Sequence, residues 1–193
     1  MGALLMRRRE MVKQGGASGR LPTEYQEVEW VGVRNSTTTP TAYIALDDVL
    51  PANATIYAEV KPFSIIGAYD SPLGTFGAGG AAEVYYDRSP SKMAIYGPRP
   101  VDFRYSIGEE WDNFSFKQTT YRVSVYLLIY RTDKYAFNGK LKTARITNSN
   151  GVVIHDYVPC YRKADGEIGV YDIIDSTFHT NSGTGTLVKG NNV

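Results

Sequence analysis

The sequence predicts an all-β fold, built as an antiparallel β-sandwich. Three dipeptides in the last third of the chain, Asn138-Gly139, Asn150-Gly151 and Asp165-Gly166, are typical of two-residue hairpin turns, which need positive φ at both central residues. The segments between them have strand length, are rich in β-branched and aromatic residues, and lack a continuous helical period. Phe137 to Thr186 is therefore predicted to be a run of hairpins.

The composition favours a single domain with a net charge close to zero. The 193 residues, 42% of them apolar, are enough for a single domain with a sizeable core. The net charge of +1 provides no field that would attract nucleic acid or an anionic membrane, so neither is expected as a partner. Cys160 is the only cysteine, which excludes an internal disulfide and fits assembly in a reducing compartment. We interpret it as a core residue and not as a nucleophile.

Two separated parts of the chain resemble one recurrent domain. The first is Leu21 to Trp30 (LPTEYQEVEW), and the second contains Asp156 to Lys163 (DYVPCYRK). The other matching words are Asn138 to Leu141, Asp165-Gly166, Gly169 to Asp172, Phe178 and Gly183 to Gly185. Together they resemble the concanavalin A-like (laminin-G-like) jelly roll of tailed phages and prophages of gut bacteria, crAss-like phages among them. The resemblance covers residues 21–188 and implies a jelly-roll fold in a virion-associated protein. It weakens at Thr41 to Leu46 (TAYIAL), where family members have a longer polar word.

The N-terminus is predicted to be a docking helix, residues 1–13, followed by a flexible Gly-rich linker, residues 14–20, and the sandwich, residues 21–193. The helix carries an apolar stripe and a group of cations, which are Leu4, Leu5, Met11 and Val12, and Arg7, Arg8, Arg9 and Lys13. Three arginines follow only a short apolar run, so the segment is neither an export signal nor a membrane span. We expect it to dock into an apolar groove with an acidic rim on another virion protein, capsid or tail.

Strand-like segments continue between these ends. Alternation or β-rich composition predicts strands at 25–33, 41–46, 55–63, 83–87, 92–96 and 120–130, the last of them central. Val28 and Trp30 are predicted to point inward. The glycines of Leu73 to Ala82 indicate a hairpin, because no Gly-Lys-Ser/Thr follows to make a phosphate loop.

The sequence contains no recognisable catalytic motif. Laminarinase-type jelly rolls carry two catalytic carboxylates in a Glu-x-Asp-x-x-Glu word, which does not occur here. His155 and His179 have no Cys or His neighbour at ligand spacing, so no metal site is predicted and both are expected at the surface or at an edge. No cofactor is expected; a calcium site assembled from separate loops leaves no linear motif to read.

Sandwich lectins hold sugars with an aromatic platform, amides and carboxylates from loops. The residues of this kind that the sequence offers are Tyr85, Tyr86, Trp111, Asp112 and Asn113. They are the candidate glycan-binding residues.

These observations favour three functions, in this order. The first is a non-enzymatic structural protein on the virion surface of a tailed phage, a head fibre or capsid decoration, assembled in the host cytoplasm as a homodimer or homotrimer. The second is a glycan- or receptor-binding adhesin of a tail or tail fibre, with host or mucus glycans as ligands. The third is a glycoside hydrolase-like enzyme.

Overall fold

The computed structural model describes residues 21–46, 49–77, 80–87, 92–96, 101–104, 110–117, 124–131 and 134–193. Every named element in these ranges is a β-strand, β1 to β17, and all strand pairs are antiparallel. The predicted all-β antiparallel class is therefore confirmed. The predicted docking helix and linker, residues 1–20, lie outside the described residues.

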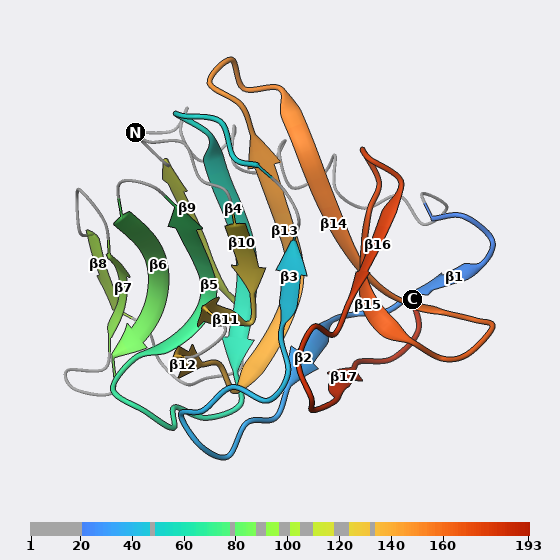
Figure 1. Cartoon of the computed structure of the whole chain (residues 1–193), viewed down its shortest axis with the longest axis horizontal. Helices are drawn as coiled ribbons and strands as arrows, with labels where there is room; N and C mark the ends of the chain where they lie inside the picture. Colours follow the sequence, from blue (N-terminus) through green and yellow to red (C-terminus); the bar gives the residue numbers. More distant parts are fainter. Residues whose placement is uncertain are drawn as a thin grey trace.

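The first sheet has nine strands and is centred on the long strand β13 (Figure 1). One edge of β13 pairs with β4 over its whole length, and the other pairs first with β2 and then with β14. Beyond these neighbours the sheet continues through β15 to β16, through β2 to β17, and through β4 to β9, while β1 pairs with the end of β14. The strands are β1 (Tyr25–Glu27), β2 (Val31–Val33), β4 (Thr55–Pro62), β9 (Asp112–Lys117), β13 (Gly139–Thr147), β14 (Val153–Arg162), β15 (Ile168–Asp172), β16 (Thr177–Thr180) and β17 (Leu187–Lys189).

The second sheet has six strands in the order β3-β10-β5-β6-β7-β8. Strand β10 lies between β3 and β5, which confirms the predicted central strand for Ser124–Leu127, and the predicted glycine hairpin joins β5 to β6. The predicted strand does not continue to Tyr130, because Leu128 has a positive φ of 67° and β11 belongs to another sheet. A small third sheet pairs β11 with β12. The strands are β3 (Ile44–Leu46), β5 (Asp70–Gly77), β6 (Gly80–Asp87), β7 (Lys92–Tyr96), β8 (Val101–Arg104), β10 (Ser124–Leu127), β11 (Ile129–Arg131) and β12 (Lys134–Ala136).

The two large sheets share one hydrophobic core. Along β4 the odd-numbered residues are half-buried and the even-numbered ones are buried, as expected for a strand with one face on the core. The core combines Ile56, Val60 and Leu141 from the first sheet with Leu73 and Val125 from the second. Each sheet thus covers the inner face of the other, which is consistent with a β-sandwich.

Two of the three predicted turns form hairpins. Asn150-Gly151 joins β13 to β14, and Asp165-Gly166 joins β14 to β15. Only the glycines have positive φ, 78° and 76°, so these are not the predicted turns with positive φ at both centres. In the first hairpin the Asn148 side chain accepts from the backbone amides of Asn150 and Val152 and stabilises a longer loop.

The third predicted turn, Asn138-Gly139, is wrong. Asn138 is buried and its amide donates to Ser64 Oγ over 2.7 Å, while Gly139 begins β13 between β2 and β4. The first predicted strand, 25–33, is also divided into β1 and β2. Val28 is buried between them as predicted, but Trp30 is only half-buried, against Phe63 and Lys140, and does not join the core.

Gly139 is predicted to be necessary for the packing around β13. A Cβ at this position would lie 2.6 Å from the Lys61 carbonyl oxygen and 2.3 Å from the Phe137 ring. We expect Gly139→Ala to lower the free energy of unfolding by about 1–3 kcal/mol, measured by urea denaturation. The matched control is Gly166→Asn, at an exposed turn with open space, because asparagine tolerates positive φ. Equal stability of Gly139→Ala and wild type would contradict the close approach.

Candidate functional site

The outer face of the first sheet carries a group of cations on aromatic rings. Lys140 on β13 pairs in register with Lys61 on β4, and its ammonium lies 4.7 Å from the Trp30 ring centre and 5.1 Å from that of Phe63. The guanidinium of Arg34 lies 4.1 Å from the Phe63 ring centre on the same cluster. We call these five residues, Trp30, Arg34, Lys61, Phe63 and Lys140, the cationic patch.

The strand register explains how the cationic patch forms. Val31 and Val33 on β2 face the core, so Gly32 between them faces outward, opposite Lys140. Without a side chain at Gly32, the Lys140 stem has room to lie against Trp30. The rings of Trp30 and Phe63 meet edge to face, with centres 5.8 Å apart. The patch is thus supported by strand pairing and by ring packing.

Electrostatics make this patch receptive to anions. Burial, followed by the nearby charges of Lys61 and Arg34, lowers the pKa of Lys140, and Glu29 only partly offsets them. Within the described ranges neither Arg34 nor Lys140 forms a salt bridge; their contacts are with aromatic rings. An anion placed here would relieve the repulsion among three positive charges.

A second group lies on the same face, farther along β13. Lys142 forms a 2.9 Å salt bridge with Glu59 on β4, and its ammonium lies 5.7 Å from the ring centre of Trp111. Exposed Asn113 on β9 is paired with Glu59. Lys140 and Lys142 are two residues apart, roughly 7 Å along a strand. The two groups therefore form one extended strip, here called the outer strip.

The structure brings only part of the predicted glycan-binding set together. Trp111 and Asn113 belong to the outer strip, whereas Tyr86 is fully buried and stacks on Phe137 in the core. Tyr86 also donates a 2.9 Å hydrogen bond to Asp112, a bond that links the two sheets. Tyr86 as a ligand-facing residue is therefore wrong, and Asp112 is turned toward a core partner. Alternation along β6 and β9 places these neighbours on opposite faces.

Tyr85 lies on the second sheet, away from Trp111. Its ring meets that of Tyr69 edge to face, with centres 5.1 Å apart, and Tyr69 in turn contacts Tyr135 at 5.4 Å. The predicted set is thus divided between two sheets. The sequence analysis did not predict the cationic patch. The signal that could have indicated it is the alternation along β4, which places Tyr57, Glu59 and Lys61 on one face.

The two histidines differ in burial: His155 is buried and His179 is half-buried. His155 is only 9% exposed, so its predicted surface position is wrong. Its Nδ1 lies 2.7 Å from Asp172 Oδ2 and 3.4 Å from Asp175 Oδ2, although the three residues have no linear spacing that signals a site. His179 on the edge strand β16 is half-buried and contacts Tyr157 edge to face, which fits the predicted edge position.

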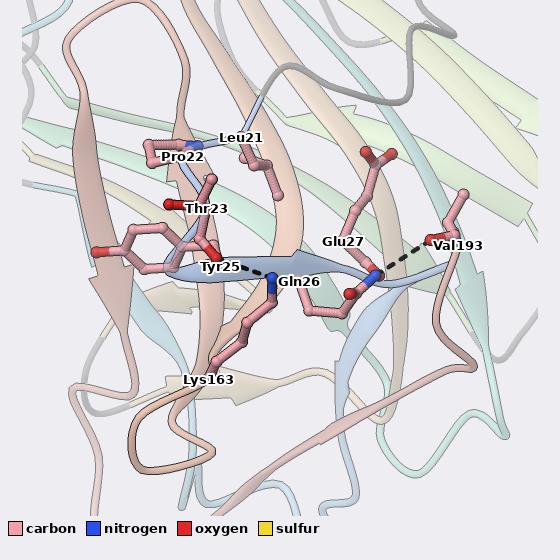
Figure 2. Close-up of a pocket in the computed structure, with 8 residues that line it drawn as sticks. All are labelled: Leu21, Pro22, Thr23, Tyr25, Gln26, Glu27, Lys163 and Val193. Carbon is pink, nitrogen blue, oxygen red and sulfur yellow. Dashed lines mark hydrogen bonds between the residues drawn. The ribbon is translucent and has the colours of Figure 1, made fainter.

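A shallow hollow lies beside β1 (Figure 2). It is lined by Leu21, Pro22, Thr23, Tyr25, Gln26, Glu27, Lys163 and Val193. Gln26 Nε2 donates to the Val193 carbonyl over 3.1 Å, and Lys163 Nζ donates to the Thr23 carbonyl over 2.8 Å. Both polar groups are used to hold chain segments together, so this hollow is explained by the fold.

Cys160 is buried, as predicted for a core residue. Burial, with a smaller contribution from Glu27, raises the pKa of its thiol to about 12, which keeps the thiol protonated and unreactive at neutral pH. The described residues contain no helix that is long and apolar enough to span a bilayer.

Comparisons with protein-family models, with curated proteins and with solved structures found no match to this chain.

The pKa of Asp112 predicts a pH dependence of stability. Burial raises this pKa above the ordinary 3.8, although the Tyr86 hydrogen bond and Lys61 act in the opposite direction. An acid with a raised pKa holds its proton more tightly in the folded state, so its contribution to stability declines as pH rises from 3.8 through the raised value. The free energy of unfolding is measured by urea denaturation for wild type and for Asp112→Asn. We expect the wild-type value minus the variant value to decline as the pH rises over this range.

Asp165→Asn provides a control of opposite sign. The hydrogen bond from Arg162 lowers the pKa of Asp165, so the corresponding difference should increase with pH. A pH-independent difference for Asp112→Asn would contradict the effect of burial on Asp112.

Proposed function

We propose that this chain is a non-enzymatic surface protein of a tailed-phage virion, a head fibre or capsid decoration. The sandwich, a concanavalin A-like jelly roll in this proposal, faces outward, and residues 1–13 attach it to another virion protein. The chain acts as a homodimer or homotrimer, so that several weak docking contacts operate together.

One observation carries the proposal. The two segments that resemble the phage domain lie far apart in the chain, yet they pair as neighbouring strands of one sheet. Tyr25 of β1 pairs with Arg162 of β14, and Glu27 of β1 pairs with Cys160 of β14. The resembling words therefore form one structural unit, which supports a shared fold with that domain.

Attachment to the virion is tested by charge substitution in the N-terminal segment. Leu4→Asp with Leu5→Asp should abolish incorporation into particles, because each buried leucine contributes roughly 1.5–3 kcal/mol to docking before entropic costs. Incorporation is measured by quantifying the protein in purified particles assembled with the variant. The isolated variant should keep the circular dichroism and unfolding curve of wild type.

The matched control places the same two charges in the linker, as Gly15→Asp with Gly16→Asp, and should be incorporated normally. Normal incorporation of the Leu4/Leu5 variant would show that residues 1–13 do not hold the protein in the particle.

The outer strip favours a second function, binding of acidic glycans. Its aromatic rings are suited to sugar rings, and the cations of the cationic patch are suited to carboxylate or sulfate groups. The extent of the strip along β13 fits a polymer more closely than a single ion. Binding of acidic glycans would suit a protein that the virion displays toward host or mucus polysaccharides.

Glycan binding is tested with an acidic polysaccharide such as alginate or hyaluronan, using calorimetry or a glycan array. Lys140→Gln should weaken binding about 10- to 150-fold, since a charge-assisted hydrogen bond is worth roughly 1.5–3 kcal/mol. Added salt should weaken binding by wild type more than by the variant. The matched control is Lys117→Gln, which removes a charge from exposed β9 on the same face but away from the patch. Equal losses in both variants, or no binding by wild type, would refute this function.

A further inference from the structure

A His–Asp–Asp cluster lies where β14, β15 and the turn after β15 meet. It consists of His155 on β14, Asp172 at the end of β15 and Asp175 in the turn. One ligand atom from each residue lies within 4.8 Å of the others. None of these residues is used in the outer strip, which lies on the other face of the sheet.

Asp172 is held in a fixed position. It is fully buried, and its Oδ1 accepts hydrogen bonds from the backbone amides of Asp156 over 3.1 Å and Ile174 over 2.9 Å. Its Oδ2 is therefore directed at His155 Nδ1, 2.7 Å away. The imidazole is held in turn by stacking on Tyr157, with ring centres 5.8 Å apart and planes 9° apart. Two of the three donors are thus preorganised by the fold.

Asp175 completes the cluster from the solvent side. Its side chain is 49% exposed, and its Oδ2 lies 3.4 Å from the same Nδ1. Nδ1 carries at most one proton, so two carboxylates converge on a single donor. Among the described residues neither carboxylate forms an ion pair with a lysine or arginine. The cluster therefore concentrates negative charge that a bound cation would neutralise.

We propose that His155, Asp172 and Asp175 bind a divalent transition-metal ion of the Zn²⁺ type. One imidazole nitrogen with two carboxylate oxygens suits this class better than Ca²⁺ or Mg²⁺, which take oxygen ligands. Tetrahedral Zn²⁺ with ligands at about 2.0–2.2 Å places neighbouring donor atoms roughly 3.3 Å apart. The separation of Nδ1 from Asp175 already fits, and that from Asp172 needs to open by about 0.6 Å. The ion replaces the Nδ1 proton, and water takes the remaining position.

The proposal is independent of virion attachment and of glycan binding. Its structural consequence is that the ion would tie the β15–β16 turn to β14. Metal binding should therefore raise the thermal unfolding temperature of the whole chain.

The test uses the untagged full-length chain, stripped with EDTA and dialysed. Calorimetry should give one Zn²⁺ per chain, and Co²⁺ should give a visible d–d spectrum when it occupies the site. Asp175→Asn should weaken Zn²⁺ binding at least ~10-fold and abolish the Zn²⁺-dependent increase in unfolding temperature. Because Asp175 is half-exposed, this variant should keep its fold, as checked by near-ultraviolet circular dichroism. Mg²⁺ and Ca²⁺ should have no effect that depends on Asp175.

Two controls separate this site from non-specific binding. Asp165→Asn removes a turn aspartate of matched exposure, 50%, and should bind Zn²⁺ like wild type. His179→Asn removes the only other histidine in the chain and should do the same. Absence of Zn²⁺ binding by wild type, or equal binding by wild type and Asp175→Asn, would overturn the site. An equal Asp175-dependent effect of Ca²⁺ would overturn the metal class.

Discussion

The close pairing of β13 with strands on both of its edges is the constraint on which the rest of the structure depends. Gly32 and Gly139 allow it, because a Cβ at Gly32 would lie 2.5 Å from the Gly139 carbonyl oxygen. With β4 on one side and β2 and β14 on the other, every residue of β13 except Lys142 is paired with a neighbouring strand. The sheet can branch at β13 because different strands occupy successive parts of one of its edges, and each neighbouring strand takes its register from β13.

This register also builds the outer strip. Residues of β13 alternate between the core and the outer face, so the pairing that places Leu141 in the core presents Lys140 beside Lys61. Lys142 is the extra residue between Leu141 and Thr143; it is exposed and lies within reach of Glu59 and Trp111. One alignment of strands thus determines which residues of β13 enter the core and which belong to the outer strip.

The sequence was informative where structure is local. The Asn150-Gly151 and Asp165-Gly166 hairpins and the alternation of β4 depend on neighbouring residues, and each was predictable. Asn138-Gly139 has the composition of a turn, but pairing with distant strands places Gly139 in β13 instead. Trp30 and His155 were misplaced for a similar reason: one is positioned by Gly190 and Lys140, the other by Asp172. These residues are distant in the chain, and no spacing in a single sequence shows that they are in contact. The candidate sites were therefore only partly predictable.

The pairing of β13 also bears on the order in which the chain folds. Strands β5 to β8 pair with their neighbours in sequence and can associate soon after synthesis. Strands β2 and β4 must wait for β13, a delay illustrated by Asn35, whose amide donates to the Phe137 carbonyl 102 residues away. Until then β2 and β4 present unpaired edges, which favour association with other chains. A ribosome-bound fragment ending before β13 should therefore be the form of this protein most dependent on chaperones.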